Sequence, residues 1–251
     1  MLNYTISGKG DVVVLLHGFC EDLSLWSNAQ NYFPNNSLLA IDLPGFGNSA
    51  ILEKQTISEI AKAVFHLLGK LEVKSFAVVG HSLGGYIALE MLKQQPTTIN
   101  KLVLFHSSVY EDSEEKKENR NKTIAFIEQH GVNNFANSFI GTLFYNENRT
   151  QHENTIIKLN EVVKNTSQEA VIETSKAMRD RLDSIHTIAN AQIPILFIVG
   201  KEDQAVPLGT SLEQLQLPQH SHILMLTKVG HMGMYEAEQA SYCTINSFIN
   251  Q

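Results

Sequence analysis

The stretch Gly80-His81-Ser82-Leu83-Gly84 decides the fold of this chain. A short apolar run precedes it, and apolar residues at helical spacing follow it. Gly80 and Gly84 each stand two positions from Ser82, where a Cβ would press on the neighbouring backbone of a sharp turn. A strand, a sharp turn and a helix in this order form a nucleophile elbow, which lifts a serine hydroxyl clear of the backbone. We therefore predict that Ser82 is a nucleophile.

A serine at such a turn needs a histidine as its base and an acid that orients the histidine. Glu202 and Asp203 follow the apolar run from Ile193 to Val199, at the predicted end of a strand. His231 lies farther along, in a loop bracketed by glycines. The order serine, acid, histidine is the one expected after a nucleophile elbow. His231 is thus the predicted base, and either carboxylate could be the acid.

Four separated motifs give the chain its family resemblance. They are His17-Gly18-Phe19 after one apolar run, Asp42-Leu43-Pro44-Gly45-Phe46-Gly47 after another, the elbow, and the acid and histidine loops. Over nearly its whole length the chain resembles the α/β-hydrolases. The resemblance implies an α/β fold with a mostly parallel sheet of about seven strands, flanked by helices. A helical lid would be inserted after the sixth family strand, although the first edge strand of many relatives is absent from this shorter N-terminus.

The resemblance also assigns roles to individual residues. It favours Asp203 over Glu202 as the acid, because the shorter side chain followed by Ala205-Val206-Pro207 is the usual form of this loop. It implies that the backbone N–H groups of Phe19 and Leu83 form the oxyanion hole. His17 would support the oxyanion loop through a buried hydrogen bond. No cofactor is implied.

Composition excludes several other classes of protein. The chain has 251 residues, 43% of them hydrophobic, which fits one domain with a large core. Its formal net charge is −7, and its lysines are scattered, so we expect no nucleic-acid partner. The start of the chain lacks the pattern of a signal peptide, and no apolar run is long enough to span a membrane. With only two cysteines and no cluster at metal-ligand spacing, we expect a cytoplasmic protein without a metal.

Apolar runs alternate with amphipathic segments along the chain, as in a parallel sheet covered by helices. The predicted strands are Leu2 to Ile6, Val12 to Leu16, Leu38 to Ile41, Phe76 to Val79, Lys101 to Phe105, Ile195 to Val199 and Ile223 to Leu226. The predicted core helices are Ser24 to Asn31, Ser58 to Leu71, Leu83 to Gln95 and Ala237 to Asn250.

A long segment between the predicted strands ending at Phe105 and starting at Ile195 contains no convincing strand. It shows four stretches of helical spacing, namely Lys116 to His130, Val132 to Thr142, His152 to Lys164 and Gln168 to Arg181. We predict that residues 110–181 form a helical lid over the serine, between two parts of the core at 1–109 and 182–251. Ala177 to Asp183 resembles a stretch found in bacterial esterases, enol-lactonases and C–C hydrolases.

Several further residues are candidates for the pocket wall: His17, Cys20, His81, His106, Phe139, Phe144 and Met232. The aromatic residues could equally form the small core of the lid. Among the arginines that a carboxylate-bearing substrate would need, Arg120, Arg149, Arg179 and Arg181 lie in or beside the predicted lid.

Three function classes remain open at this point. The favoured one is a serine hydrolase that cleaves a small carboxylic ester or lactone through an acyl-enzyme. The alternative uses the same triad to hydrolyse a carbon–carbon bond, or to eliminate a group as in the menaquinone-pathway synthase that this fold also hosts. A ligand sensor with vestigial activity is the third. The expected partner is a small-molecule substrate, and the oligomeric state is left open.

Overall fold

Seven strands form one sheet in the computed structural model, which describes residues 1–251. The strands are Tyr4–Gly8 (β1), Asp11–Leu16 (β2), Asn36–Ile41 (β3), Phe76–His81 (β4), Ile99–Phe105 (β5), Ile195–Gly200 (β6) and Ser221–Leu226 (β7). Their order is β1-β3-β2-β4-β5-β6-β7. β1 runs antiparallel to β3, and all other neighbours are parallel. The predicted mostly parallel sheet, with a single antiparallel strand before β2, is confirmed.

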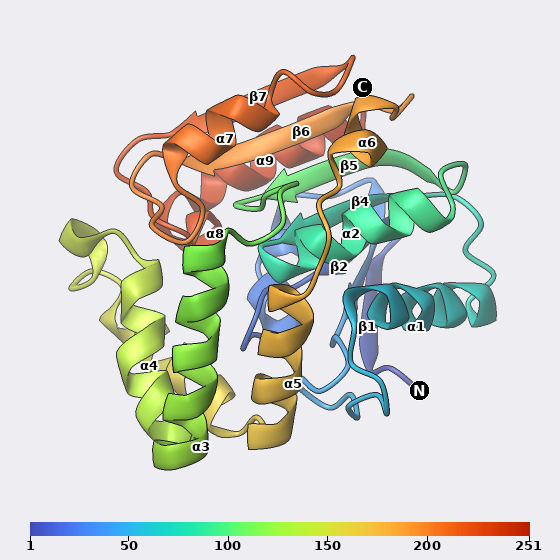
Figure 1. The fold of residues 1–251 in the computed structure, drawn as a ribbon. Helices are drawn as coiled ribbons and strands as arrows, with labels where there is room; N and C mark the ends of the chain where they lie inside the picture. The colour runs from blue at the N-terminus through green and yellow to red at the C-terminus, as the bar shows by residue number, and fades with distance from the viewer.

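Helices connect the strands and cover the sheet (Figure 1). The α-helices are Ile57–Lys70 (α1), Leu83–Gln94 (α2), Glu114–Leu143 (α3), Glu153–Lys164 (α4), Gln168–Arg179 (α5), Ile185–Ala189 (α6), Leu208–Gln214 (α7), Gly233–Glu236 (α8) and Glu238–Ile249 (α9). Short 3₁₀ helices span Leu23–Trp26 (η1), Ala29–Asn31 (η2) and Asn146–Asn148 (η3). None of the helices is both long and apolar enough to cross a membrane.

Burial along the strands follows from this covering. Every residue of β4 and β6 is buried, because both faces of these central strands lie under helices. The edge strands β1 and β7 keep most of their residues exposed or half-buried. In Figure 1, α1 and α2 lie in front of the sheet, whereas α9 lies behind β6. The carboxyl ends of β4 and β6 are therefore packed on both faces by core residues.

Helices α3, α4 and α5 form one group between β5 and β6 in the chain, which we call the inserted helices. The group lies on the side toward which β5 and β6 point in Figure 1. Ser113 caps the start of α3, and Ser167 caps the start of α5, each by accepting a backbone N–H. Gly131, with φ 78°, interrupts α3 between the two helical stretches that the sequence predicts. The role of these helices as a lid stays a prediction.

Two predicted helices differ in the structure, and three short helices, α6, α7 and α8, are not among the predicted ones. The predicted helix at Ser24 to Asn31 is instead η1 and η2, since the Asp22 side chain accepts the Ser24 N–H and closes a tight turn. The predicted C-terminal helix begins at Glu238, because Ala237 has a non-helical backbone with φ −144° and ψ 49°. Each of these three short helices is too brief for its periodicity to be read.

Candidate active site

Ser82 lies at the turn between β4 and α2, in a strained backbone conformation. Its φ of 49° and ψ of −111° are rarely adopted by a residue with a side chain. A Cβ at Gly80 would collide with the backbone of Gly84, and one at Gly84 would collide with the Leu16 carbonyl. Because both positions are closed to larger residues, the glycines of the motif allow the sharp turn. The Ser82 N–H donates to the Phe105 carbonyl at 2.9 Å, which anchors the turn to β5.

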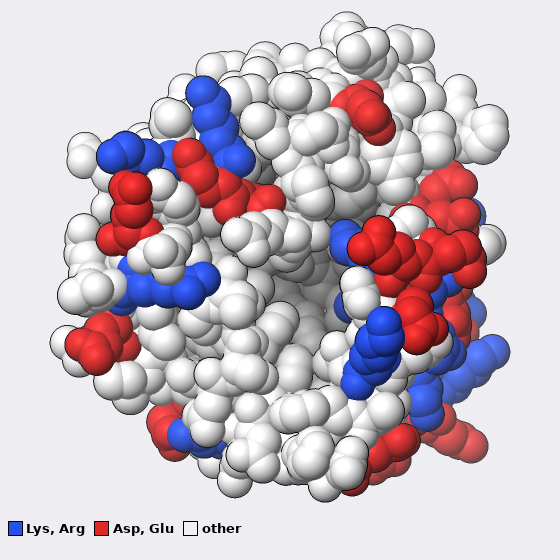
Figure 2. Space-filling model, turned by 60° about the vertical axis from the view of Figure 1, so that its left-hand side comes forward, with Lys and Arg blue, Asp and Glu red and all other residues white.

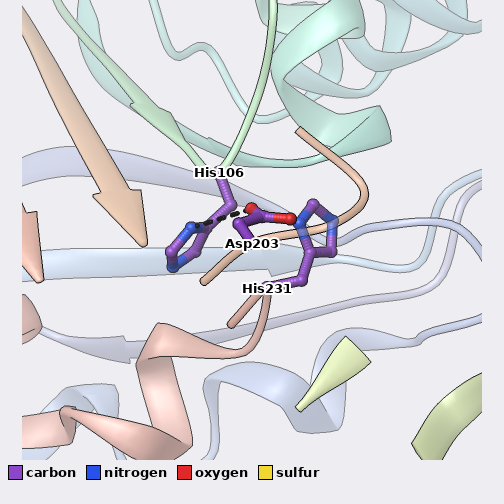
Figure 3. Close-up of side chains that lie close together, drawn as sticks. All are labelled: His106, Asp203 and His231. Atoms are coloured by element: carbon purple, nitrogen blue, oxygen red, sulfur yellow. Dashed lines mark hydrogen bonds and ion pairs between the residues drawn. The ribbon is translucent and has the colours of Figure 1, made fainter. Parts of the chain in front are cut away.

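His231 and Asp203 meet from loops that follow neighbouring strands (Figure 3). His231 Nδ1 lies 2.7 Å from Asp203 Oδ2, and both residues are buried. Asp203 Oδ1 accepts the N–H groups of Ala205 and Val206 at 2.8 and 2.9 Å. Burial opposes ionisation of Asp203, but the charge and hydrogen bond of His231 outweigh it, so the carboxyl pKa lies well below its usual value. Asp203 is therefore a carboxylate that can orient the imidazole.

Glu202 takes a different position from its neighbour. Its carboxylate accepts the Val229 N–H at 3.0 Å and bonds to no histidine. Of the two acids that the sequence offers, only Asp203 bonds to the imidazole of His231.

His106 approaches Asp203 from the side opposite to His231 (Figure 3). Its Nδ1 lies 3.3 Å from Asp203 Oδ2, and its Nε2 accepts the Gly233 N–H at 3.2 Å. Burial lowers the pKa of His106 to about 4, so the ring is neutral at pH 7. A proton on Nδ1 satisfies the contacts with Asp203 and Gly233, whereas the Gly200 N–H, 3.3 Å from Nδ1, would need Nδ1 as an acceptor. The three side chains have potential metal-ligating atoms within 4.8 Å of one another, a convergence that the sequence analysis did not foresee.

Ser82 and His231 line the same cavity, which we call the Ser82 cavity. Its volume is about 230 Å³, and Figure 2 shows a hollow on one face of the molecule. Core loops and the inserted helices both contribute to its wall. The residues that line it are Phe19, Glu21, Ser82, Tyr86, Lys116, Asn119, Arg120, Thr123, Phe135, Phe139, Leu143, Ser175, Met178, Ala205, Val206 and His231. A cavity of this size suits a small molecule.

The two predicted oxyanion donors lie on adjacent segments. Leu83 is the first residue of α2, where a backbone N–H has no carbonyl partner within the helix. Phe19 lies in the loop after β2, and its ring packs against those of Phe135 and Phe139 at centroid distances of 6.3 and 6.0 Å. No backbone or side-chain acceptor in the protein takes up the Phe19 N–H. Both N–H groups are thus available to a ligand.

His17 is buried beneath this loop rather than lining the cavity. Its Nδ1 lies 2.8 Å from the Gly18 carbonyl, and its Nε2 accepts the Leu43 N–H at 2.9 Å. These two bonds require a neutral ring with its proton on Nδ1. Burial lowers the pKa of His17, which also favours the neutral ring. His17 therefore ties the Phe19 loop to the segment that follows β3.

Glu21 and His81 form a second buried acid–histidine pair beside the first. Glu21 Oε2 accepts the Gly18 N–H at 2.5 Å and lies 2.9 Å from His81 Nδ1. His81 Nε2 donates to the His231 carbonyl at 3.0 Å. Burial favours the neutral form of each group, but the attraction between Glu21 and His81 outweighs it, so the Glu21 pKa falls and the His81 pKa rises. The pair links the Phe19 loop to the backbone of His231.

Sequence reasoning missed Glu21. The only available signal was a carboxylate three residues after the His17-Gly18 pair. Nothing local shows that this carboxylate meets His81, because the contact joins two different loops at the edge of the sheet.

Five of the pocket candidates besides His17 do not line the Ser82 cavity. Cys20 is fully buried with a left-handed φ of 61°, and burial raises the pKa of its thiol. His81 and His106 are occupied by the buried contacts described above. Phe144 packs against the rings of His152 and Tyr235, and Met232 is buried in the core. Phe139 is the one aromatic candidate that lines the cavity.

The arginines considered for substrate binding lie in different surroundings. Arg120 lines the Ser82 cavity. Arg181 is buried behind it and stacks on the Tyr86 ring, 3.9 Å from the centroid. Arg179 pairs with Asp180 at the surface, and Arg149 lies outside the cavity wall.

A larger cavity of about 540 Å³ lies on another side of Tyr86 and Arg181. Neither Ser82 nor His231 lines it, and its wall carries charged side chains of both signs. We therefore place the candidate active site in the smaller Ser82 cavity, where the reactive side chains converge.

Comparison with known proteins identifies the kind of fold. A family model described as the alpha/beta hydrolase fold matches residues 11–238. A curated relative from Pseudomonas sp, named 2-hydroxy-6-oxononadienedioate/2-hydroxy-6-oxononatrienedioate hydrolase, is 25% identical over 255 residues, covering 92% of this chain and 85% of the relative. A 2-succinyl-6-hydroxy-2,4-cyclohexadiene-1-carboxylate synthase from Escherichia coli is 32% identical, but only over 37% of this chain and 36% of its own length.

Solved structures show the same architecture. A thermophilic esterase from Thermogutta terrifontis superposes with a TM-score of 0.93 at 23% identity, covering 99% of this chain and 93% of that one. An enol-lactonase from Burkholderia xenovorans LB400 superposes with a TM-score of 0.92 at 20% identity, covering 100% and 96%. At these identities the likeness concerns the fold alone.

Proposed function

The chain belongs to the α/β-hydrolase fold family, and on that basis we propose that it is a serine hydrolase that cleaves a small carboxylic ester or lactone. One observation carries the proposal: His231, held by Asp203 at 2.7 Å, lines the same small cavity as the strained Ser82. In such an arrangement the acid fixes the imidazole tautomer, and Nε2 is left to accept a proton from the serine. The turn at Ser82 costs backbone strain, and a role for Ser82 as the nucleophile gives a reason why the protein keeps this strain.

The proposed reaction has two halves. As Ser82 Oγ attacks the carbonyl carbon, its proton passes to His231 Nε2, and Asp203 stabilises the imidazolium that forms. The Phe19 and Leu83 N–H groups bind the oxyanion, a contribution of about 3 kcal/mol for each such donor. Collapse of the intermediate breaks the bond to the leaving oxygen, which takes the proton from His231. Water, deprotonated by the same histidine, then releases the acyl group and restores Ser82.

A second candidate is hydrolysis of a carbon–carbon bond in an oxo acid, or elimination by proton abstraction, with the same three side chains. The name of the Pseudomonas relative, which denotes a dienedioate substrate, favours it. The same fold hosts ester hydrolysis and carbon–carbon or elimination chemistry, so the fold alone does not distinguish the two candidates. Turnover of a ring-cleavage oxo acid in preference to every ester and lactone would favour this candidate.

A panel of p-nitrophenyl esters of increasing acyl length, together with simple lactones and an oxo-acid substrate, tests the proposal. We expect ester or lactone turnover in the wild type and loss of at least about a thousandfold in Ser82→Ala. Ser138→Ala is the matched control, because Ser138 bonds only within α3. A fluorophosphonate probe should label Ser82 and should fail to label His231→Gln. Ester turnover that survives in Ser82→Ala would refute the proposal.

A further inference from the structure

The wall of the Ser82 cavity has two chemically different parts. The apolar part consists of Phe19, Phe135, Phe139, Leu143, Met178 and Val206. Four polar residues, Lys116, Asn119, Arg120 and Thr123, also line the cavity. They follow one another along α3 at intervals of three, one and three positions, so they share one face of that helix. This face contributes two cationic side chains to a cavity that is otherwise largely apolar.

Arg120 is only partly neutralised within the protein. Its Nε–H donates to the Asp112 carboxylate, and its two Nη groups have no partner in the protein. Asp112 is shared with Arg181, whose Nη1 lies 2.8 Å from it. Two guanidinium groups therefore face one carboxylate, which leaves one positive charge uncompensated. Both Nη groups of Arg181 bond to backbone carbonyls, of Met178 and Tyr110, and Arg181 does not line the cavity, so Arg120 is the member of the pair that offers Nη donors there.

Lys116 adds a second uncompensated charge. Its Nζ donates to the Ala205 carbonyl at 3.0 Å, and no carboxylate lies within ion-pair distance of it. Of the acids on the first turns of α3, Glu114 and Glu118 pair with Lys117 and Lys122, and Glu115 is exposed and forms no ion pair with Lys116. Figure 2 shows Lys and Arg atoms at one edge of the hollow, with Asp and Glu atoms beside them on the outer surface.

Glu21 is the one acidic residue that lines the Ser82 cavity, and it is already paired. Its carboxylate is 2.9 Å from His81 Nδ1 and accepts the Gly18 N–H. Among the residues that line the cavity, Lys116 and Arg120 are therefore the cations without a lining carboxylate as partner. Both cations are half-buried and open to the cavity, and the fork of a guanidinium matches the geometry of a carboxylate.

We propose that the Ser82 cavity binds a substrate that carries a carboxylate, and that Arg120 and Lys116 hold this group while the carbonyl to be attacked lies at Ser82. The carboxylate would receive the free Nη–H donors of Arg120 and the charge of Lys116, with the apolar wall against the intervening carbon chain. The reaction at Ser82 rests on the proposed function. The binding of the anion does not.

A binding experiment tests the anion site without catalysis. Titration calorimetry on Ser82→Ala measures the affinity for succinate, glutarate and adipate, each against its uncharged diamide. We expect at least one diacid to bind about tenfold or more tightly than its diamide. Arg120→Gln should abolish that preference, and Arg120→Lys, which keeps a charge, should retain part of it. Lys116→Met, which gives up a single bond to a carbonyl, should reduce it independently.

Arg179→Gln is the matched control. Arg179 is also a lid-segment arginine, but it bonds to Asp180 and Asn121 at the surface and does not line the cavity. It should keep the full preference for the diacid. Equal affinity for every diacid and its diamide would overturn the proposal, as would an equal loss in Arg179→Gln and Arg120→Gln.

Kinetic assays distinguish a failure of the anion site from a failure of the proposed hydrolase activity. The wild type is assayed with monoethyl adipate and with its half-amide, ethyl 5-carbamoylpentanoate, which has nearly the same shape without the charge. We expect kcat/KM to favour the anionic ester about tenfold or more, and this ratio to fall in Arg120→Gln. If the diacids bind selectively and no ester is turned over, the proposed function fails and the anion site stands. Turnover without any preference for the anionic ester overturns the anion site alone.

Discussion

Replacing Glu21 separates the charge of the Glu21–His81 pair from its hydrogen bonds. Glu21→Ala removes the acceptor of the Gly18 N–H and leaves His81 without its partner in a fully buried position. Breaking a buried ion pair from one side costs about 3 to 5 kcal/mol. In Glu21→Gln the amide oxygen can take the place of Oε2 and accept both the Gly18 N–H and the Nδ1–H of a neutral His81, so only the bond from His81 Nε2 to the His231 carbonyl is lost. The expected loss for Gln is then closer to about 1 kcal/mol.

The effect of pH on this pair has a definite sign. The His81 pKa is raised from 6.5, so its contribution to stability is complete below 6.5 and is lost as pH rises through the raised value. The Glu21 pKa is lowered from 4.5, so its contribution is complete above 4.5 and is lost as pH falls through the lowered value. His81 also faces Asp203, His231 and His106, which are the same in both variants. The difference between wild type and Glu21→Gln should therefore be largest near pH 5 to 6.

Urea unfolding followed by circular dichroism measures both effects. At about 3 kcal/mol per molar urea, the Ala variant should lower the midpoint by about 1 M or more at pH 5.5, and the Gln variant by much less. The gap between wild type and Gln should narrow at pH 9. Equal losses in the two variants, or a gap that does not depend on pH, would refute the assignment of a charged pair.

The other predictions concern the triad acid, the cavity wall and the thiols. Asp203→Asn should lower kcat by about a thousandfold or more in an initial-rate ester assay, and Glu202→Gln by less than about threefold, because only Asp203 bonds to the base. Phe139→Ala should move the preferred acyl length toward longer chains while changing acetate-ester turnover by less than about tenfold, and an unchanged length profile would contradict its place in the wall. In a thiol-reagent time course, exposed Cys243 should react at once and buried Cys20 only after unfolding, since burial raises its pKa.

The strands of the sheet could be predicted from sequence because they depend on local signals. Each strand is a short apolar run, and each is followed by a motif that cannot continue it, such as the glycines around Ser82. The predicted strand ends differ from the observed ones by a few residues at most. Edge strand β1 is the most displaced, starting at Tyr4 because Asn3 instead bonds to Ser49 and Asp42.

The cavity wall could not be predicted in the same way. Phe139 and Phe144 look equivalent in the sequence, yet only Phe139 faces the cavity, because α3 ends between them and Phe144 turns toward Tyr235. The face of α3 that carries Lys116 and Arg120 is set by its packing against α4 and α5, which no local pattern encodes. His106 could have been inferred from topology, since β5 and β6 are neighbours and its position follows Phe105, which pairs with Ile198.

Two buried charged residues that flank the inserted helices, Asp112 and Arg181, give a reason why Arg120 would keep a fixed position. Arg181 bonds to Tyr110, at the start of the insertion, and to Met178, near its end, so it joins the two ends of the segment. The same guanidinium stacks on Tyr86, one turn after Ser82 on α2. Asp112 then connects Arg181 to Arg120. Because a buried ion pair depends closely on its geometry, this chain of contacts fixes Arg120 relative to the helix that begins at the elbow. The cationic face and the nucleophile are thus held by one connected set of side chains, although they belong to separate segments of the sequence.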